Sequence, residues 1–164
     1  MKIGIMADTH DNIEAINKAI AFFNEQKVSQ VIHCGDIIAP SVAPLFKALK
    51  PKLKVVFGNN DGDRYTLRRR LEAQGAEVYE DFGEIVINGE RICFLHGTVE
   101  AIVSALIKSN IYKAVIRAHS HQANIIQGET LLINPGEASG MLTGRKSIAT
   151  YDLKRNKAEI VELR

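Results

Sequence analysis

The sequence predicts an α/β protein in which two stacked β-sheets carry helices on their outer faces. The first half alternates short apolar runs with amphipathic segments, and such alternation builds parallel βαβ units. The second half contains mostly short strands separated by tight turns. A chain of 164 residues, 46% hydrophobic and 24% charged, fits one globular domain spanning 1–164.

Three strands, each followed by a helix, are expected in the first half. Their continuously apolar character suits a sheet covered on both faces. Apolar residues recur with helical spacing between 11 and 26, and Asp11 or Asn12 can cap that helix. The expected strands are 3–7, 31–34 and 53–57, and the expected helices are 11–26, 41–50 and 62–74.

The second half is expected to begin with a hairpin. Asn88-Gly89 separates 78–87 from 90–95, a strong signal for a two-residue turn. A helix over 99–110 and a buried strand over 114–118 follow. The remaining strands are expected to run mostly antiparallel, over 122–127, 130–134, 146–153 and 157–163.

Composition and charge exclude several classes of protein. Twenty-one basic residues against 19 acidic ones leave a net charge of +2, which argues against attachment to nucleic acid or membrane by bulk charge. No apolar run approaches the roughly 18 residues of a membrane helix, and the N-terminal run is too short for a signal peptide. Cys34 and Cys93 lack CxxC spacing, so free thiols and a cytoplasmic location are expected.

Residues that can bind metal follow directly after five of the expected strands. Ligands gather beyond the carboxyl ends of parallel strands, so these loops are expected to converge on one crevice. The loops are Asp8-Thr9-His10, Gly35-Asp36, Gly58-Asn59-Asn60-Asp61, His96-Gly97 and His119-Ser120-His121.

These loops offer seven donors and no thiolate. Seven exceed the needs of one tetrahedral ion and suit two ions about 3.5–4 Å apart, bridged by one carboxylate. Mixed oxygen and nitrogen ligands suit Mn²⁺, Fe²⁺, Co²⁺, Ni²⁺ or Zn²⁺. Such a pair favours hydrolysis of phosphate esters, with peptide or amide hydrolysis left open. The donors are Asp8, His10, Asp36, Asn59, His96, His119 and His121.

The order of these motifs resembles that of the calcineurin-like metallophosphoesterases. The short length and the late Asn134-Pro135-Gly136 resemble the compact YfcE-type phosphodiesterase branch, and the likeness runs from Lys2 to about Leu153. The resemblance implies a four-layer α/β/β/α sandwich of two mixed sheets flanked by helices. It also implies two divalent transition-metal ions as cofactors, manganese ahead of nickel, cobalt, iron or zinc.

Residue roles follow from the same resemblance. Asp8, His10 and His121 would hold the first ion, Asn59, His96 and His119 the second, and Asp36 would bridge them. A metal-bridging hydroxide would attack phosphorus. Asp36, Asn60 and Asp61 are the predicted catalytic residues. In similar enzymes an arginine from the loop 135–145 can face the substrate phosphate, which makes Arg145 the candidate here.

Two positions depart from the family pattern. Asn60 stands where many relatives have histidine; asparagine cannot act as a general acid but can donate a hydrogen bond to a phosphoryl oxygen. Asp61 would then order the loop. Ala118 stands where glycine is usual and would be strained if the backbone there needed a positive φ.

The remaining polar candidates have local interpretations. Thr98 is expected to cap the helix after it, with a contact to phosphate as the alternative. The basic cluster of Arg64 and Arg68-Arg69-Arg70 predicts a solvated helix face or a docking surface for an anion. Structural roles are expected for Thr9, His33, Cys34 and Arg117.

The sequence thus predicts a dinuclear-metal phosphodiesterase with an open site for a small phosphate ester or a nucleotide-like substrate. A catalytically weak binding scaffold of the same fold, as in the retromer subunit, is one alternative. A nuclease of the same superfamily is the other. A homo-oligomer is expected only because symmetric dimers are common among proteins in general, and no feature of this sequence indicates one.

Overall fold

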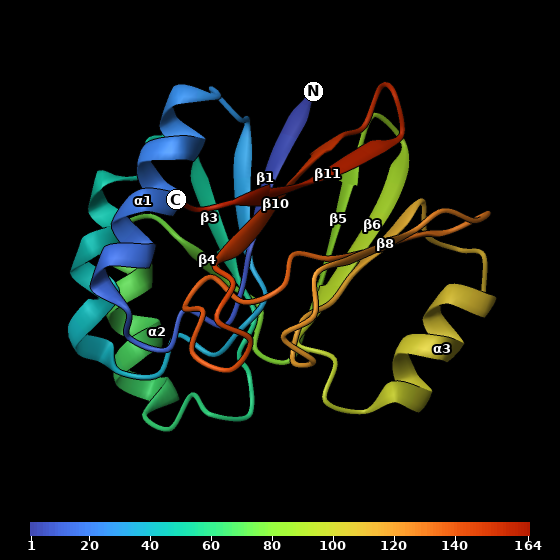
Figure 1. Ribbon diagram of the computed structural model, residues 1–164. Coiled ribbons are helices and arrows are strands. Elements are labelled where there is room, and N and C mark those ends of the chain that lie inside the picture. Colours follow the sequence, from blue (N-terminus) through green and yellow to red (C-terminus); the bar gives the residue numbers. More distant parts are fainter.

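The computed structural model describes residues 1–164 and shows two sheets stacked face to face (Figure 1). Three helices cover the outer face of one sheet, and a single helix, α3, covers the other sheet (Figure 1). The expected four-layer sandwich of two mixed sheets is therefore confirmed. No helix combines the length and apolar character needed to cross a membrane.

The first sheet has six strands in the order β11-β10-β1-β2-β3-β4. Strands β1 to β4 run parallel, and β10 returns antiparallel to β1. Asn12 caps α1 through its side-chain oxygen, which accepts from the Ala15 N–H at 3.0 Å. The strands are Lys2–Met6 (β1), Gln30–His33 (β2), Lys52–Val55 (β3), Glu77–Val78 (β4), Ser147–Asp152 (β10) and Lys157–Glu162 (β11), and the covering helices are Ile13–Glu25 (α1), Pro40–Ala48 (η1) and Arg64–Glu72 (α2).

The helix expected over 41–50 is a 3₁₀ helix, η1, rather than an α-helix. Pro44 lies inside it, and proline has no N–H with which to bond the carbonyl four residues earlier. That carbonyl belongs to Pro40 and accepts a hydrogen bond from Arg70 Nη1 at 2.9 Å instead. An arginine of the basic cluster therefore joins α2 to η1.

The second sheet has the order β5-β6-β7-β9-β8. Strands β5 and β6 form the expected hairpin, with Asn88 and Gly89 both at positive φ in its turn. The elements are Phe82–Ile87 (β5), Glu90–Leu95 (β6), Glu100–Lys108 (α3), Ala114–Ile116 (β7), Asn124–Ile126 (β8) and Leu131–Asn134 (β9).

One expectation for the second half was wrong. The strand expected over 78–87 is divided between β4 in one sheet and β5 in the other, because the chain crosses between the sheets at 79–81. The later strands run mostly antiparallel, as expected, because β8 pairs antiparallel with β9, and β10 with β1 and β11. Strand β9 is the exception, since it lies parallel to β7. The carboxyl ends of β6, β7 and β9 consequently share one edge.

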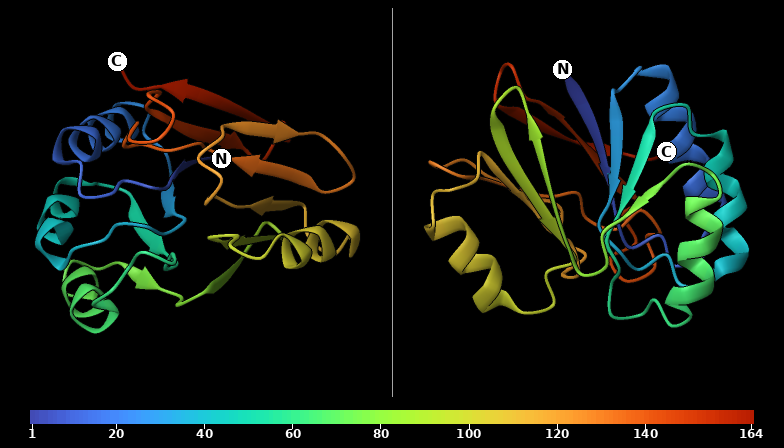
Figure 2. Two further views of the ribbon diagram at one scale, coloured as in Figure 1. Left: turned by 60° about the horizontal axis from the view of Figure 1, so that its bottom comes forward. Right: turned by 180° about the vertical axis from the view of Figure 1, so that it is seen from behind.

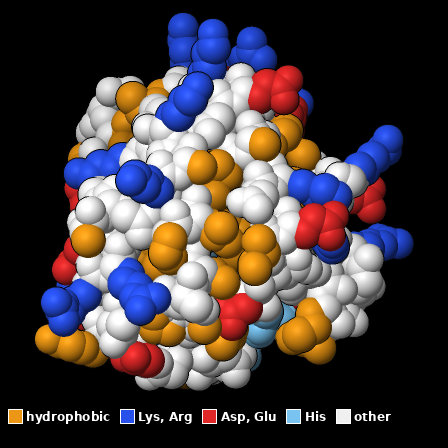
Figure 3. Space-filling view, turned by 90° about the vertical axis from the view of Figure 1, so that its left-hand side faces the viewer, with side chains coloured by type: hydrophobic (Ala, Val, Ile, Leu, Met, Phe, Trp, Pro, Cys, Tyr) orange, Lys and Arg blue, Asp and Glu red, His pale blue; other side chains and the backbone are white.

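Apolar side chains fill the space on both faces of the first sheet. Alternation along β1 sends Ile3 and Ile5 toward the second sheet and Met6 toward the helices. Gly4 also faces the helices, and a Cβ there would lie 2.6 Å from the ring of Phe23. The loops after the parallel strands of both sheets gather at the same end of the sandwich (Figure 2). On the face covered by α1 and α2, histidine reaches the surface at one edge, beside apolar and acidic side chains (Figure 3).

Candidate metal centre

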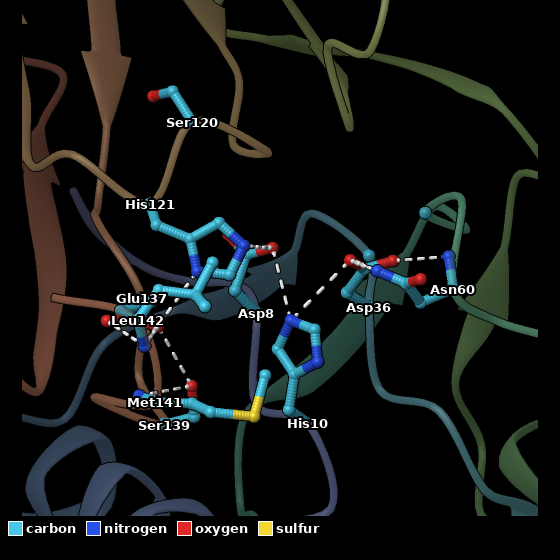
Figure 4. Close-up of polar contacts among 12 residues, drawn as sticks. Asp8, His10, Asp36, Asn60, Ser120, His121, Glu137, Ser139, Met141 and Leu142 are labelled. Carbon is cyan, nitrogen blue, oxygen red and sulfur yellow. Dashed lines mark hydrogen bonds and ion pairs between the residues drawn. The ribbon is translucent and has the colours of Figure 1, made fainter.

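Four predicted ligands meet where the loops of the two sheets converge. Asp8 and His10 follow β1, Asp36 follows β2, and His121 follows β7 of the second sheet. One ligand atom from each lies within 4.8 Å of all the others, and their side chains point toward one another (Figure 4). The two sheets therefore contribute to a single ligand cluster.

Three polar atoms of this cluster lack hydrogen-bond partners. Both carboxylate oxygens of Asp8 and Nε2 of His10 are buried and unpaired. Nε2 of His121 lies 3.5 Å from Asp8 Oδ1, and Nε2 of His10 lies 3.9 Å from it. An unpaired buried carboxylate costs several kcal/mol unless a cation compensates it. These side chains therefore fit a divalent cation.

The protonation of the cluster agrees with this fit. Burial, aided by repulsion from Asp36, raises the pKa of Asp8 to about 8. Burial lowers the pKa of His10, which keeps its imidazole in the neutral form that binds metal. Both shifts arise mainly because burial disfavours the charged form of each group, and a bound cation would compensate the charge of Asp8.

A second group of predicted ligands shares Asp36 with the first. Asp36 Oδ2 lies 3.6 Å from Nε2 of His10 and 3.5 Å from Nε2 of His96. His96 Nε2 is also 3.0 Å from Asn59 Oδ1, and the ring centroids of His96 and His119 are 5.1 Å apart. One carboxylate oxygen thus lies between the two groups.

The backbone is left-handed at five of the seven predicted ligands. The φ angles are 50° at Asp8, 41° at His10, 59° at Asp36, 68° at His119 and 58° at His121. This region is uncommon for residues with a side chain, although Asp and His tolerate it better than most. Such strain gathers at functional sites and costs about 1 kcal/mol or more at each residue.

The Ala118 departure causes no such strain. Ala118 is not among the residues with positive φ, and its side chain is fully buried between the sheets. A methyl group is therefore accommodated at this position.

Asp61 organises the loops around Asp36. Its carboxylate accepts backbone hydrogen bonds from Asp36, Ile37, Ile38 and Gly58, at 2.7–2.9 Å. All four hydrogen bonds come from backbone N–H groups, so Asp61 orders the loops on both sides of Asp36, as expected.

Asn60 contacts Asp36 directly. Its N–H donates to Asp36 Oδ1 at 2.9 Å, and its side-chain amide donates to Oδ2 at 2.7 Å. Gly58 leaves the room that Asp36 needs, because a Cβ at Gly58 would lie 2.1 Å from Asp36 Oδ1.

Sequence reasoning missed Glu137, which follows β9. Its fully buried carboxylate accepts from His121 Nδ1 at 2.8 Å and from Thr143 Oγ1 at 2.6 Å. Burial raises its pKa, but hydrogen bonds from Thr143 and His121 outweigh that and lower it to about 2. A carboxylate behind a ligating histidine fixes the ring and its tautomer. The one signal in the sequence is a lone acid in the glycine-rich segment 135–144.

His33 and Thr9 have structural roles in the fold, as expected. His33 Nδ1 accepts from the Gly35 N–H at 3.2 Å, which leaves Nε2–H to donate to Thr9 Oγ1 at 3.1 Å. Both side chains are fully buried, and neither belongs to the cluster of Asp8, His10, Asp36 and His121. Cys34 is also fully buried, and burial raises the pKa of its thiol.

Thr98 does not cap α3, contrary to expectation. The N-cap residue is Val99, and no side chain bonds to the exposed N–H groups of that helix end. Thr98 instead lines a cavity together with Asn59 and His96. Arg145 is exposed and forms no ion pair. The guanidinium of Arg117 lies under the His96 loop, bonded to the Gly97 carbonyl and to Glu100.

The fold and this ligand set define a family. The sequence profile of the calcineurin-like phosphoesterase superfamily domain matches residues 1–156. The chain belongs to that superfamily, which confirms the family and the enzyme class predicted from the motifs.

Comparisons with individual relatives agree with this family assignment. The chain is 39% identical over 164 residues to phosphodiesterase MJ0936 of Methanocaldococcus jannaschii. The match covers 98% of this chain and 99% of the relative. It superposes on the structure of an archaeal phosphodiesterase with a TM-score of 0.95, at 37% identity, over 99% of this chain and 100% of the other. The phosphoesterase YfcE of E. coli shares the fold, with a TM-score of 0.72 at 16% identity and full coverage of both chains.

Proposed function

We propose that this chain hydrolyses phosphodiesters with two divalent metal ions held between its two sheets. The observation that carries the proposal is the position of Asp36 Oδ2, within 3.6 Å of His10 Nε2 and 3.5 Å of His96 Nε2. A carboxylate shared by two sets of ligands is the arrangement that a metal pair needs.

Each predicted ligand has a place in this proposal. Asp8, His10 and His121 hold one ion, Asn59, His96 and His119 hold the other, and Asp36 contacts both. When bound, such a pair lowers the pKa of water and neutralises charge on a phosphoryl group. Manganese is the first ion to test, followed by nickel, cobalt, iron and zinc, because the oxygen and nitrogen ligands suit all five.

The remaining polar side chains orient the substrate. The Asn60 amide, now bonded to Asp36 Oδ2 at 2.7 Å, can turn to donate to a phosphoryl oxygen. It cannot protonate a leaving group, so esters with good leaving groups are the expected substrates. Arg145 and Thr98 are proposed phosphate contacts; Arg145 is exposed and free of ion pairs, and Thr98 lies beside His96. A diester is favoured because the relative that is 39% identical bears the name phosphodiesterase.

The test pairs elemental analysis with two chromogenic esters. Metal content per chain is measured after loading with Mn²⁺, Ni²⁺, Co²⁺ or Zn²⁺, and hydrolysis of bis-p-nitrophenyl phosphate is compared with that of p-nitrophenyl phosphate. Close to two metals per chain with faster cleavage of the diester is expected. Full metal loading without turnover of either ester contradicts the proposal and favours a binding scaffold.

A further inference from the structure

A cavity of about 230 Å³ opens beside the second group of predicted ligands. Asn59 and His96 form its inner side, and Leu95, Val99 and Ile102 line it from β6 and the start of α3. None of Asp8, His10 and His121 lines it. The cavity therefore adjoins one side of the metal centre only.

We propose that this cavity binds the non-leaving ester group of a phosphodiester and prefers a flat ring there. The inference rests on the proposed function and names the class of substrate. Hydrolysis adds water across one P–O bond: the leaving group departs as an alcohol or phenol, and the group in the cavity stays on the phosphate monoester product.

One wall of the cavity is apolar and open to solvent. Val99 and Ile102 are 52% and 51% exposed, although Leu95 next to them is buried. Exposed aliphatic side chains gathered at a ligand site gain free energy when a ligand covers them, at about 25 cal/mol per Å². An apolar ring inserted here would cover both.

The polar side of the cavity is already neutralised. Arg64 is the only lysine or arginine in its lining, and its guanidinium donates to Asp81 Oδ1 and to the Gly58 carbonyl, both at 2.8 Å. It also lies 5.3 Å from the centre of the Phe57 ring. A planar guanidinium held this way can stack on a ring but has no free charge for a second phosphate. The electrostatics therefore favour a ring over an anion.

Size and direction agree with this assignment. The cavity is smaller than the roughly 300–1,000 Å³ of sites that enclose drug-sized ligands, so it admits a single ring system. In an in-line displacement the attacking and leaving oxygens lie opposite each other, so the non-leaving group projects to the side. A cavity that adjoins the metal centre only on the side of Asn59 and His96 can hold a group that projects in this way.

The kinetic test keeps one leaving group and changes the other ester group. Methyl p-nitrophenyl phosphate and phenyl p-nitrophenyl phosphate both release p-nitrophenolate, and KM for the phenyl ester is expected to be lower by about 10-fold or more. Ile102→Asp should raise KM for the phenyl ester more than KM for the methyl ester, so that the ratio of the two KM values falls toward one. Ile111→Asp is the matched control, because Ile111 is 53% exposed and lies outside the cavity.

A binding measurement separates this proposal from the proposed function. Methyl phenylphosphonate and methyl methylphosphonate are added to the zinc-loaded protein while the methyl signals of Val99 and Ile102 are followed by NMR. Their P–C bonds cannot be hydrolysed, and their one P–O ester bond has methoxide, a poor leaving group. Shifts with the phenyl compound alone support the cavity, even if neither ester turns over and the proposed function fails. Equal KM values for the two esters, or no difference between the phosphonates, overturn the cavity proposal and leave the proposed function standing.

Discussion

The Nδ1–H of His121 donates to Oε2 of Glu137 across 2.8 Å, and this bond turns Nε2 of His121 toward Asp8. Removing the charge of Glu137 should therefore loosen a metal ligand without touching the metal. Glu137→Gln is expected to lower metal affinity about 10- to 100-fold, the usual effect of losing a carboxylate behind a ligating histidine. Competition with a chelating dye for the metal ion measures this affinity. Glu129→Gln is the control, since Glu129 is exposed and unpaired; equal affinities in the two variants would contradict the role of Glu137.

Asp36 is the residue on which the two-metal proposal depends. Asp36→Ala should reduce metal content below two per chain and lower kcat by about 10²–10³-fold or more, the scale of losing one strong electrostatic stabiliser. Circular dichroism should show that the fold survives. Asp63→Ala is the comparison, because Asp63 only caps α2. Wild-type activity in the Asp36 variant would refute the dinuclear assignment.

Asp61 should matter for stability as well as for activity. Asp61→Ala leaves four backbone N–H groups without their carboxylate acceptor, which costs about 3 kcal/mol or more. For a chain of this length the melting temperature should fall by about 6–12 °C. Asp63→Ala removes a helix cap and should cost about 1 kcal/mol. Thermal melts of the two metal-free variants provide the comparison, and equal shifts would argue against the loop-ordering role.

His33 should make the metal-free protein less stable in mild acid. Burial lowers its pKa from 6.5 to about 3. Below pH 6.5 the unfolded chain therefore takes up a proton that the folded chain does not, so stability falls as the pH falls toward 3. Between pH 7 and 5 this residue contributes a loss of about 2 kcal/mol. Urea unfolding at both pH values should show a loss about 2 kcal/mol smaller in His33→Gln than in the wild type; identical pH dependence of the two proteins would contradict it.

The predicted ligands were identifiable because each follows a run of apolar residues that ends abruptly. The length of those runs fixes where a strand ends, and parallel strands then bring their ends together. The same reasoning could not find Glu137, because 122–163 was expected to run mostly antiparallel, and β9 is parallel to β7. Only that parallel pairing places the loop after Asn134 beside the loop of His121.

Prediction from the local sequence also failed where a contact with a distant residue determines the secondary structure. The 3₁₀ character of η1 depends on Pro44 together with Arg70, which takes the freed carbonyl of Pro40. The division of 78–87 between two sheets depends on β3, since Tyr79 N–H donates to the Val55 carbonyl before the chain leaves the first sheet. Neither contact can be recognised from the sequence of the segment whose structure it determines.

The left-handed backbone at His10 and His119 restricts how this site can evolve. Such a conformation is easiest for glycine, asparagine, aspartate and histidine, and hardest for β-branched residues. A library of replacements at His10 selected for folding alone should therefore return mainly those four residues. The same library selected for metal retention should narrow to histidine. Lineages that abandon the metal are thus expected to drift first to asparagine or glycine at these positions, with the loops unchanged in shape.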